Sequence, residues 1–471
     1  MFSSFSARSA RRRGAARLAA AALASGLVAV GVIAGAGAAA ADAQQTTQSQ
    51  GGATATIGAL KTYGAAVIHD AGGDQQVSAG LFEMSVDGGG TLQTYCVDIH
   101  NPTQRDAKYH ETAWSGTSLG TNNEAGKIRW ILQNSYPQVN DLAALAAKAG
   151  VKGGLTEQDA AAGTQVAIWR YSDGADVDAV DPQAERLADY LQKSAVALPE
   201  PKASLTLSPP AVSGHPGELL GPVTVHTNAD GAAVTPPADA ATSGVRIVGK
   251  DGKPVTSAVN GSQIFFDVPG DAPAGSADIT VQASTTVPVG RAFTSETRSQ
   301  TQILAGSSES TVSAPASATW AAKGAIPALS AVKNCTKGGL DVTAANTGDA
   351  AFTFELMGAG YSIPAGQSRT VTIPLREDQA YDFTIKGPGG LGKRFAGVLD
   401  CQTQGTGSGD TTQILSAPSP ATVGGTADDT NLAETGGSGT TPLIAGIAIA
   451  FVLIGGAALV LLGRKNAPTQ D

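Results

Sequence analysis

An apolar segment near each end of the chain confines the folded part to the residues between them. Near the N-terminus, residues 18–36 are rich in Ala, Leu and Val, and five arginines precede them: Arg8, Arg11, Arg12, Arg13 and Arg17. Small residues suited to cleavage follow between Ala41 and Ala43. This order is typical of a signal peptide, and an uncleaved membrane anchor is the alternative. We therefore interpret residues 1–43 as a signal peptide and expect the protein to be secreted.

The second apolar segment, residues 443–462, carries no charge and is long enough to cross a bilayer core, which takes about 20 helical residues. Arg464 and Lys465 follow directly and would stay on the cytoplasmic side. A pentapeptide precedes the segment: Leu432, Ala433, Glu434, Thr435 and Gly436. The three parts in this order resemble the cell-wall sorting signal of Gram-positive surface proteins, in the Leu-Ala-x-Thr-Gly variant of actinobacteria. An ordinary tail anchor is the alternative.

The sorting-signal resemblance implies how the protein is attached to the cell. A sortase would cleave between Thr435 and Gly436 and join Thr435 to peptidoglycan through an amide bond. The precursor would be held in the membrane by residues 443–462, and the mature protein would be anchored to the cell wall at the cell surface. Ala433 stands where the commoner motif has proline, which leaves the sortase class open.

The formal charge argues against some classes of partner. It is −9 for the whole chain and −14 once residues 1–41, with five arginines and no acidic residue, are removed. Nucleic acid and anionic lipid bind basic surfaces, so we expect neither as a partner. The chain has no Cys-x-x-Cys spacing, and its five histidines form no cluster with ligand spacing. We therefore expect no metal site and no cofactor.

The three cysteines are an odd number for an exported protein. Cys335 and Cys401 bracket one late segment and most simply form a disulfide. Cys96 is then left without a partner. An odd cysteine of this kind is either a free reactive thiol or a thiol committed to other chemistry.

The chain between the two ends divides into three folded regions and a spacer. Aromatic residues make up only 5%, whereas the chain holds 59 Gly and 24 Pro, which favours small β-domains and spacers over one large core. Residues 403–430 are rich in Gly, Ser, Thr and Pro and cannot bury enough apolar surface to fold. The folded regions are residues 53–198, 203–313 and 326–402.

The first region mixes strand and helix patterns. Strand-like segments at 81–84 and 91–99 come first, and apolar residues at helical spacing follow at 124–136. Thr156 to Asp159 is typical of a capping box and predicts a helix that continues through 165 and 169. Asp181 followed by Pro182 predicts a further helix that ends near Ala195.

The second and third regions alternate apolar and polar residues in the β manner. The clearest strands lie at 263–268, 278–282, 352–356, 369–373 and 381–385. Short alternating strands separated by turn residues indicate sandwiches of immunoglobulin-like type. We assign no chemistry to either region.

Cys96 and Gln165 lie in two segments that carry a family resemblance. Cys96 belongs to Tyr-Cys-Val-Asp at 95–98, and Gln165 belongs to Thr-Gln-Val-Ala-Ile-Trp at 164–169. From the residues alone, a buried unpaired cysteine is usually an inert core residue. Together with residues 127–137, however, these segments resemble the signature blocks of Gram-positive thioester domains, over residues 53–198.

The resemblance implies a covalent chemistry for the pair. The thiol of Cys96 would displace ammonia from the carboxamide of Gln165, and a thioester would form spontaneously. An amine, typically from a lysine of another protein, would then open the thioester and become amide-linked to Gln165. Asp98 could orient the site or assist proton transfer, but an aspartate at a strand end more often satisfies backbone donors, and we favour that interpretation.

The predicted architecture is multidomain: a signal peptide at 1–43, an α+β thioester domain at 53–198, two all-β immunoglobulin-like sandwiches at 203–313 and 326–402, the second with the disulfide, a disordered spacer at 403–430, and the sorting signal at 432–471 with its C-terminal transmembrane helix. The predicted function is a wall-anchored adhesin that binds an amine-bearing surface ligand covalently. Because the bond is made once and without turnover, such a protein is not an enzyme.

Two other functions compete with the adhesin. One is a passive structural protein of the wall or surface in which Cys96 is an ordinary free thiol. The other is a secreted cysteine hydrolase that combines Cys96 with His100 or His110 and with Asp98. No recognised protease or amidase block surrounds Cys96, which disfavours the hydrolase.

Overall fold

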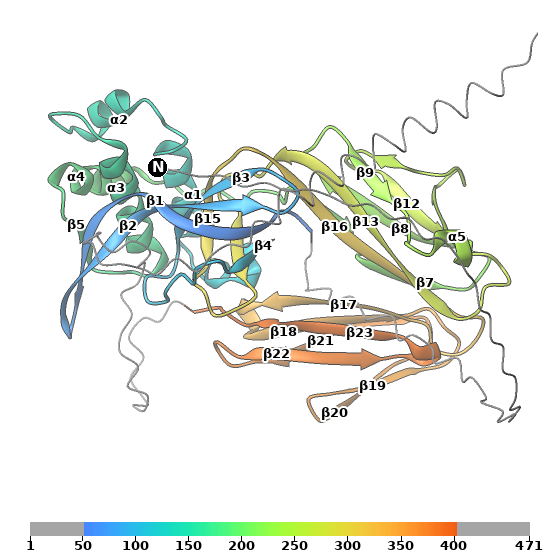
Figure 1. Cartoon of the computed structure of the whole chain (residues 1–471). Coiled ribbons are helices and arrows are strands. Elements are labelled where there is room, and N and C mark those ends of the chain that lie inside the picture. The colour runs from blue at the N-terminus through green and yellow to red at the C-terminus, as the bar shows by residue number, and fades with distance from the viewer. Residues whose placement is uncertain (1–50, 403–471) are drawn as a thin grey trace, which may run out of the picture. The chain divides into compact units, whose positions relative to one another are not determined.

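The computed structural model describes residues 51–402 (Figure 1). This part of the chain is mostly β, with several sheets. None of the helices within residues 51–402 is long and apolar enough to cross a membrane. The predicted signal peptide, spacer, sorting motif at 432–436 and apolar span at 443–462 lie outside the described residues.

A seven-stranded sheet forms the first region, and two of its strands come from far along the chain. Its order is β2-β3-β15-β14-β4-β1-β5, and β1 also pairs with β2. Six of the strands therefore close into a ring, and β5 adds to β1. The strands are β1 (Thr54–Asp70), β2 (Gly73–Val86), β3 (Thr91–Cys96), β4 (Lys108–Thr112), β5 (Val177–Ala179), β14 (Ala292–Ser295) and β15 (Gln302–Ser307).

Four helices belong to the same region and lie beside β1 and β2 in Figure 1: α1 (Ala125–Asn134), α2 (Leu142–Ala149), α3 (Glu157–Ser172) and α4 (Pro182–Ser194). The predicted capping box is confirmed, because Thr156 and Asp159 exchange hydrogen bonds at the start of α3. The predicted Asp181 cap and Pro182 start of α4 are confirmed too. Two short 3-10 helices, η1 (Trp114–Gly116) and η2 (Ser118–Gly120), precede α1.

Helix α3 is the central helix of the region, and residues 160–169 along it are all buried. Small residues make this possible, since Gly163 lies so close to α4 that a Cβ there would meet the carbonyl oxygen of Ala184 at 2.4 Å. The other neighbours of α3 include β1, β2 and β3. Because α3 is enclosed on several sides, water is excluded from its buried side chains.

The second region contributes to two further sheets. One has the order β10-β12-β8-β6 and the other β11-β9-β13-β16-β7. Their elements are β6 (Leu205–Ser208), β7 (Ala211–Gly214), β8 (Leu219–Thr227), β9 (Ala232–Thr235), α5 (Ala240–Ser243), β10 (Arg246–Gly249), β11 (Ser257–Ala258), β12 (Gln263–Asp267), β13 (Gly275–Thr286) and β16 (Glu309–Trp320). Strand β13 alternates buried and exposed residues along its length, as expected for a half-buried strand.

The hairpin β14–β15 departs from the predicted range 203–313. After β13 the chain leaves the second region, adds β14 next to β4 and β15 next to β3, and returns as β16, which pairs with β13 along its length. The range 203–313 therefore supplies strands both to its own sheets and to the closed sheet of the first region. The two sheets of the second region and the closed sheet of the first region therefore cannot fold as independent segments of sequence.

The third region has its own apolar core and the predicted disulfide between Cys335 and Cys401 is confirmed. Its strands pair as β17-β18-β21, β19-β20 and β22-β23. The elements are β17 (Pro327–Asn334), η3 (Cys335–Lys337), β18 (Gly339–Asn346), β19 (Phe352–Leu356), β20 (Ala359–Ile363), β21 (Gln367–Pro374), β22 (Ala380–Lys386), η4 (Pro388–Gly390) and β23 (Gly392–Val398). The disulfide closes a loop with a sequence separation of 66 residues. Because loop closure lowers the conformational entropy of the unfolded chain, it stabilises the region by about 4 kcal/mol.

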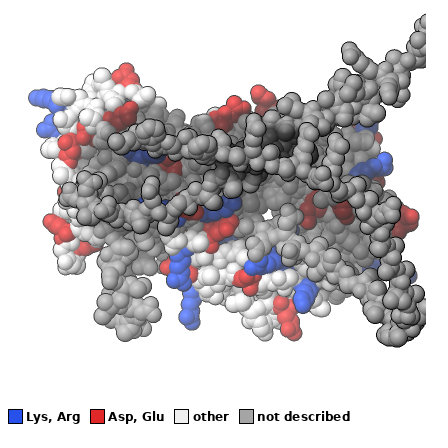
Figure 2. Space-filling model, in the orientation of Figure 1, with Lys and Arg blue, Asp and Glu red and all other residues white. Residues whose placement is uncertain are grey.

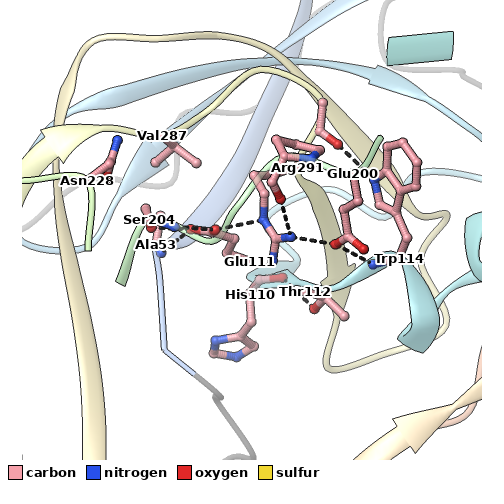
Figure 3. Close-up of polar contacts among 12 residues, drawn as sticks. Ala53, His110, Glu111, Thr112, Trp114, Glu200, Ser204, Asn228, Val287 and Arg291 are labelled. Atoms are coloured by element: carbon pink, nitrogen blue, oxygen red, sulfur yellow. Dashed lines mark hydrogen bonds and ion pairs between the residues drawn. The ribbon is translucent and has the colours of Figure 1, made fainter. Parts of the chain in front are cut away.

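A buried ionic network holds the hairpin against the first region (Figure 3). Arg291 precedes β14, and its Nε donates to Oε1 of Glu111 on β4 at 2.9 Å. Its Nη1 donates to Glu200 at 2.5 Å. Glu111 also accepts from the backbone N–H groups of Ala53 and Ser204. The network joins the start of β1, strand β4, the linker before β6 and the start of β14.

Most other ion pairs lie at the surface. On the face shown in Figure 2, acidic and basic side chains of the described residues are interspersed. The pair between Arg246 and Asp267 is typical, with the arginine side chain 66% exposed, whereas the side chains of Arg291 and Glu111 are 6% and 0% exposed. Exposed pairs contribute little, while a buried charge without its partner is strongly destabilising.

We predict that Arg291→Ala lowers the free energy of unfolding by about 3–5 kcal/mol, because it leaves the Glu111 carboxylate buried without its cation. Arg246→Ala is the matched control and should cost less than about 1 kcal/mol. Urea denaturation of the two variants measures the difference. Equal losses would contradict a structural role for the buried network.

Candidate functional site

Cys96 and Gln165 meet inside the first region although 69 residues separate them. Cys96 ends β3 and is 1% exposed, and it is a free cysteine. The backbone N–H of Cys96 donates to Oε1 of Gln165 at 2.9 Å, and Nε2 of Gln165 donates to the carbonyl oxygen of Cys96 at 2.9 Å. Both the oxygen and the nitrogen of the Gln165 carboxamide are therefore hydrogen-bonded to the backbone of Cys96, the residue that carries the thiol.

Helix α3 places Gln165 next to β3, in a buried environment from which water is excluded. Gln165 itself and its apolar neighbours Val166, Ile168 and Trp169 have no exposed surface. The indole Nε1 of Trp169, one turn after Gln165, has no hydrogen-bond partner among the described residues. Exclusion of water matters for this site because a thioester is lost when water attacks it.

The sulfur of Cys96 has two polar neighbours that the sequence analysis did not find. Nε2 of Gln302 on β15 donates to Sγ at 3.3 Å, and Oγ1 of Thr103 lies 4.0 Å from Sγ. Gln302 is the direct cross-strand partner of Cys96 in the pairing of β15 with β3. Gln302 lies in the range 203–313, where we predicted no functional residue, and the structure brings it into contact with the sulfur.

Burial dominates the acidity of the thiol. It raises the pKa of Cys96 to about 12, while the hydrogen bonds from Gln302 and Thr103 lower the pKa and the nearby carboxylates of Asp98 and Asp173 raise it. The thiol is therefore protonated at neutral pH. A reaction at Sγ has to move that proton.

Asp98 caps the loop that follows β3. Its Oδ1 accepts from the backbone N–H of His100 at 3.2 Å, and its Oδ2 accepts from the side chain of Asn101. Asp173 at the end of α3 accepts from the backbone N–H of Ile99 at 3.0 Å. Burial, followed by the charge of Asp173, raises the pKa of Asp98 to about 7, and burial raises the pKa of Asp173 to about 6. Asp98 thus accepts from a backbone donor, which is the kind of contact that we favoured for it.

Neither histidine considered for a hydrolase is hydrogen-bonded to the sulfur of Cys96 in the part of the chain that the structure describes. His100 is exposed. His110 contacts Thr54 at 3.1 Å through Nδ1 and Glu296 at 2.6 Å through Nε2. Neither is among the polar partners of Cys96, so the structure does not assemble the Cys–His pair that the hydrolase hypothesis requires.

Comparison with known families covers both the Cys96 and the Gln165 segment. Residues 93–197 match the thioester-domain family. Residues 315–398 match a second family, described as the C-terminal domain of bacterial phospholipase C. The first match contains both members of the pair, whereas the second covers β17–β23 and the second half of β16.

Solved structures similar to the chain include a TIE protein and a thioester domain. The Bacillus anthracis TIE protein is 16% identical with a TM-score of 0.27, over 74% of this chain and 64% of that one. The thioester domain of the Enterococcus faecium TIE86 protein is 15% identical with a TM-score of 0.27, over 57% of this chain and 96% of that one. The E. coli chaperone DraB is 14% identical with a TM-score of 0.15, over 42% and 98%. The chain thus spans less than two thirds of the B. anthracis protein, and no curated protein matches it.

We predict that stability falls as pH rises because of Asp98. Its pKa in the folded protein is about 7, above its ordinary value of 3.8, so the folded state binds a proton that the unfolded state has released. The stabilisation is complete below about pH 4 and is lost as pH rises toward about 7. Asp98→Asn should flatten this decline, and the exposed Asp278→Asn should not. Urea denaturation between about pH 4 and about pH 8 tests it.

Proposed function

We propose that the protein is a cell-surface adhesin that binds its target covalently through a thioester between Cys96 and Gln165. One observation carries the proposal: the carboxamide of Gln165 is held by two hydrogen bonds on the backbone of Cys96, inside a segment that matches the thioester-domain family. Both bonds are made to the backbone of Cys96, whereas the carboxamide in contact with Sγ is that of Gln302. Peptide mapping of the amine adduct distinguishes the two glutamines as acyl partner.

The chemistry proceeds in two balanced steps. In the first, Sγ of Cys96 attacks Cδ of Gln165, the C–N bond breaks, and ammonia leaves with the thiol proton. In the second, an amine of the target attacks the same carbon, the C–S bond breaks, and the sulfur takes a proton released by the amine. The products are an amide at Gln165 and a free thiol, so the site is spent after one bond.

In this proposal the other regions of the chain carry the site and anchor it to the cell wall. The second and third regions act as immunoglobulin-like stalk domains, and the sorting motif attaches Thr435 to peptidoglycan. The target is an amine-bearing surface ligand, with the lysine of a protein as the most accessible source. The passive-protein alternative predicts an unmodified thiol, and the hydrolase alternative predicts turnover of an amide substrate.

We predict that the secreted protein has a mass lower than its sequence by one ammonia. Methylamine should add one molecule of itself, and peptide mapping should place the methylamide at Gln165. Cys96→Ala and Gln165→Ala should each have the full sequence mass and take up no methylamine. Gln158→Ala, an exposed glutamine on the same helix, is the matched control and should behave as wild type. A full-mass protein with a titratable Cys96 would contradict the adhesin.

We predict that Thr435→Ala moves the protein from the cell-wall fraction to the membrane fraction or the medium, because the sortase acylation step needs this threonine. Immunoblotting of fractionated cells measures the distribution. Thr430→Ala in the preceding spacer should leave the protein in the wall. Continued covalent attachment of Thr435→Ala would show that the motif is not the anchor.

A further inference from the structure

The carboxamide in contact with the Cys96 sulfur is that of Gln302. Gln302 is fully buried and lies opposite Cys96 on the neighbouring strand. Its Nε2 lies 3.3 Å from Sγ, and its carbonyl carbon, Cδ, is bonded to that nitrogen. Gln165, in contrast, bonds the backbone N–H and the carbonyl oxygen of Cys96. The two glutamines therefore stand in different relations to the cysteine, one to its side chain and one to its backbone.

Cys96 and Gln302 form a non-hydrogen-bonded pair of the two antiparallel strands. The backbone N–H and C=O of Cys96 are both bonded to Gln165, on the side away from β15. The bond to β15 comes from the next residue, since the N–H of Val97 donates to the carbonyl oxygen of Thr301 at 3.1 Å. In such pairs the Cα atoms lie about 4.5 Å apart instead of about 5.5 Å, which brings the side chains closer together. The backbone pairing thus presses the thiol and the Gln302 carboxamide against each other.

Gln165 takes the place of a neighbouring strand on the other edge of β3. The register of β2 with β3 ends at Thr94, so the backbone of Cys96 lies past the end of that pairing. There the carboxamide of Gln165 accepts from the N–H and donates to the C=O, as a peptide group of a strand would. Gln165 therefore satisfies the backbone of Cys96 and leaves its side chain to Gln302.

The oxygen of the Gln302 carboxamide is held by Thr94. Oε1 accepts a hydrogen bond from the Thr94 hydroxyl at 3.0 Å. Thr94 is fully buried and lies two residues before Cys96, on the same face of β3. Attack on a carboxamide carbon moves negative charge onto the carbonyl oxygen, and a donor already directed at that oxygen stabilises the charge. The contact prepares the carbonyl of Gln302 for attack by a nucleophile on this face.

We propose that the thioester joins Sγ of Cys96 to Cδ of Gln302, and that Thr94 is a catalytic residue that donates to the oxygen of this carbonyl. The inference rests on the thioester chemistry of the proposed function and assigns the acyl carbon to the glutamine that contacts the sulfur. Gln165 is then a positioning residue, which fixes the backbone from which the thiol projects. The thiol, the carboxamide and the donor all lie on two paired strands, β3 and β15.

Both steps balance with the groups at this site and a target amine. In formation, Sγ bonds to Cδ of Gln302, the C–N bond breaks, and Nε2 leaves as ammonia with the thiol proton. Oγ1 of Thr103 lies 4.0 Å from Sγ and 3.4 Å from Nε2, so one hydroxyl contacts both the atom that loses the proton and the atom that gains it. In opening, the amine attacks Cδ, the C–S bond breaks, and the sulfur takes a proton released by the amine. Negative charge forms on Oε1 in both steps, next to the hydroxyl of Thr94.

The first measurement locates the acyl carbon in the wild-type secreted chain, so it does not depend on the folding of a variant. The chain is treated with methylamine, digested with trypsin and mapped by tandem mass spectrometry. Gln302 lies in the tryptic peptide 299–323 and Gln165 in the peptide 153–170. We expect the methylamide in the first peptide, at Gln302.

The second measurement tests the two glutamines and Thr94 by substitution. Gln302→Met should keep the full sequence mass, whereas Gln165→Met should still lose ammonia, more slowly than wild type; with Gln165 as the acyl partner the two results would be exchanged. Thr94→Val keeps the shape of the side chain and removes the donor, and should slow methylamine incorporation by about a hundredfold among the molecules that have lost ammonia. Thr94→Ser keeps the hydroxyl and should react at nearly the wild-type rate. Thr280→Val, at an exposed position on β13, is the matched control.

The outcomes distinguish this inference from the proposed function. If the wild-type protein retains its ammonia, the thioester function fails and the inference fails with it. If ammonia is lost and the methylamide maps to Gln165, the assignment of Gln302 is overturned and the thioester function stands. If the methylamide maps to Gln302 but Thr94→Val reacts as fast as Thr280→Val, the catalytic role of Thr94 is overturned.

Discussion

The pairing of β15 with β3 is the constraint on which the site depends. Without β15, strand β3 would be an edge strand, and its last residue, Cys96, would face solvent on one side. The pairing closes the sheet, buries the thiol and places Gln302 against it in a single register. Because β15 follows strands β6 to β13 in sequence, closure of the ring requires the sheets that contain these strands to return the chain to the right place. The Arg291–Glu111 network beside β14 lies at that point of return.

Local sequence signals predicted the elements that position Gln165. The capping box at Thr156, the Asp181–Pro182 helix start and the disulfide all rest on a few neighbouring residues or on counting, and the structure contains each of them. The mixed character of the first region was predicted as well. Strand β1 was not predicted, because its irregular burial pattern and its two register shifts with β2 obscure a period of two.

Gln302 could not be found in the same way. Nearly every residue of β14 and β15 is buried, so neither strand alternates in the manner that identifies a strand from sequence. The stretch from Ser299 to Gln302 is polar and has the composition of a loop, yet all four residues are buried. Only the cross-strand pairing shows that Gln302 lies opposite Cys96. A contact across 206 residues leaves no local signal.

The buried polar groups around Cys96 are satisfied by hydrogen bonds. Burying a carboxamide is costly unless it is hydrogen-bonded, and Gln165, Gln300 and Gln302 all have partners. Nε2 of Gln300 binds the carbonyl oxygens of Asp98 and Asn101, which fastens the loop after β3 over the site. The same loop carries Thr103 to the sulfur. On the proposed function, the contacts that bury these groups keep water from the thioester.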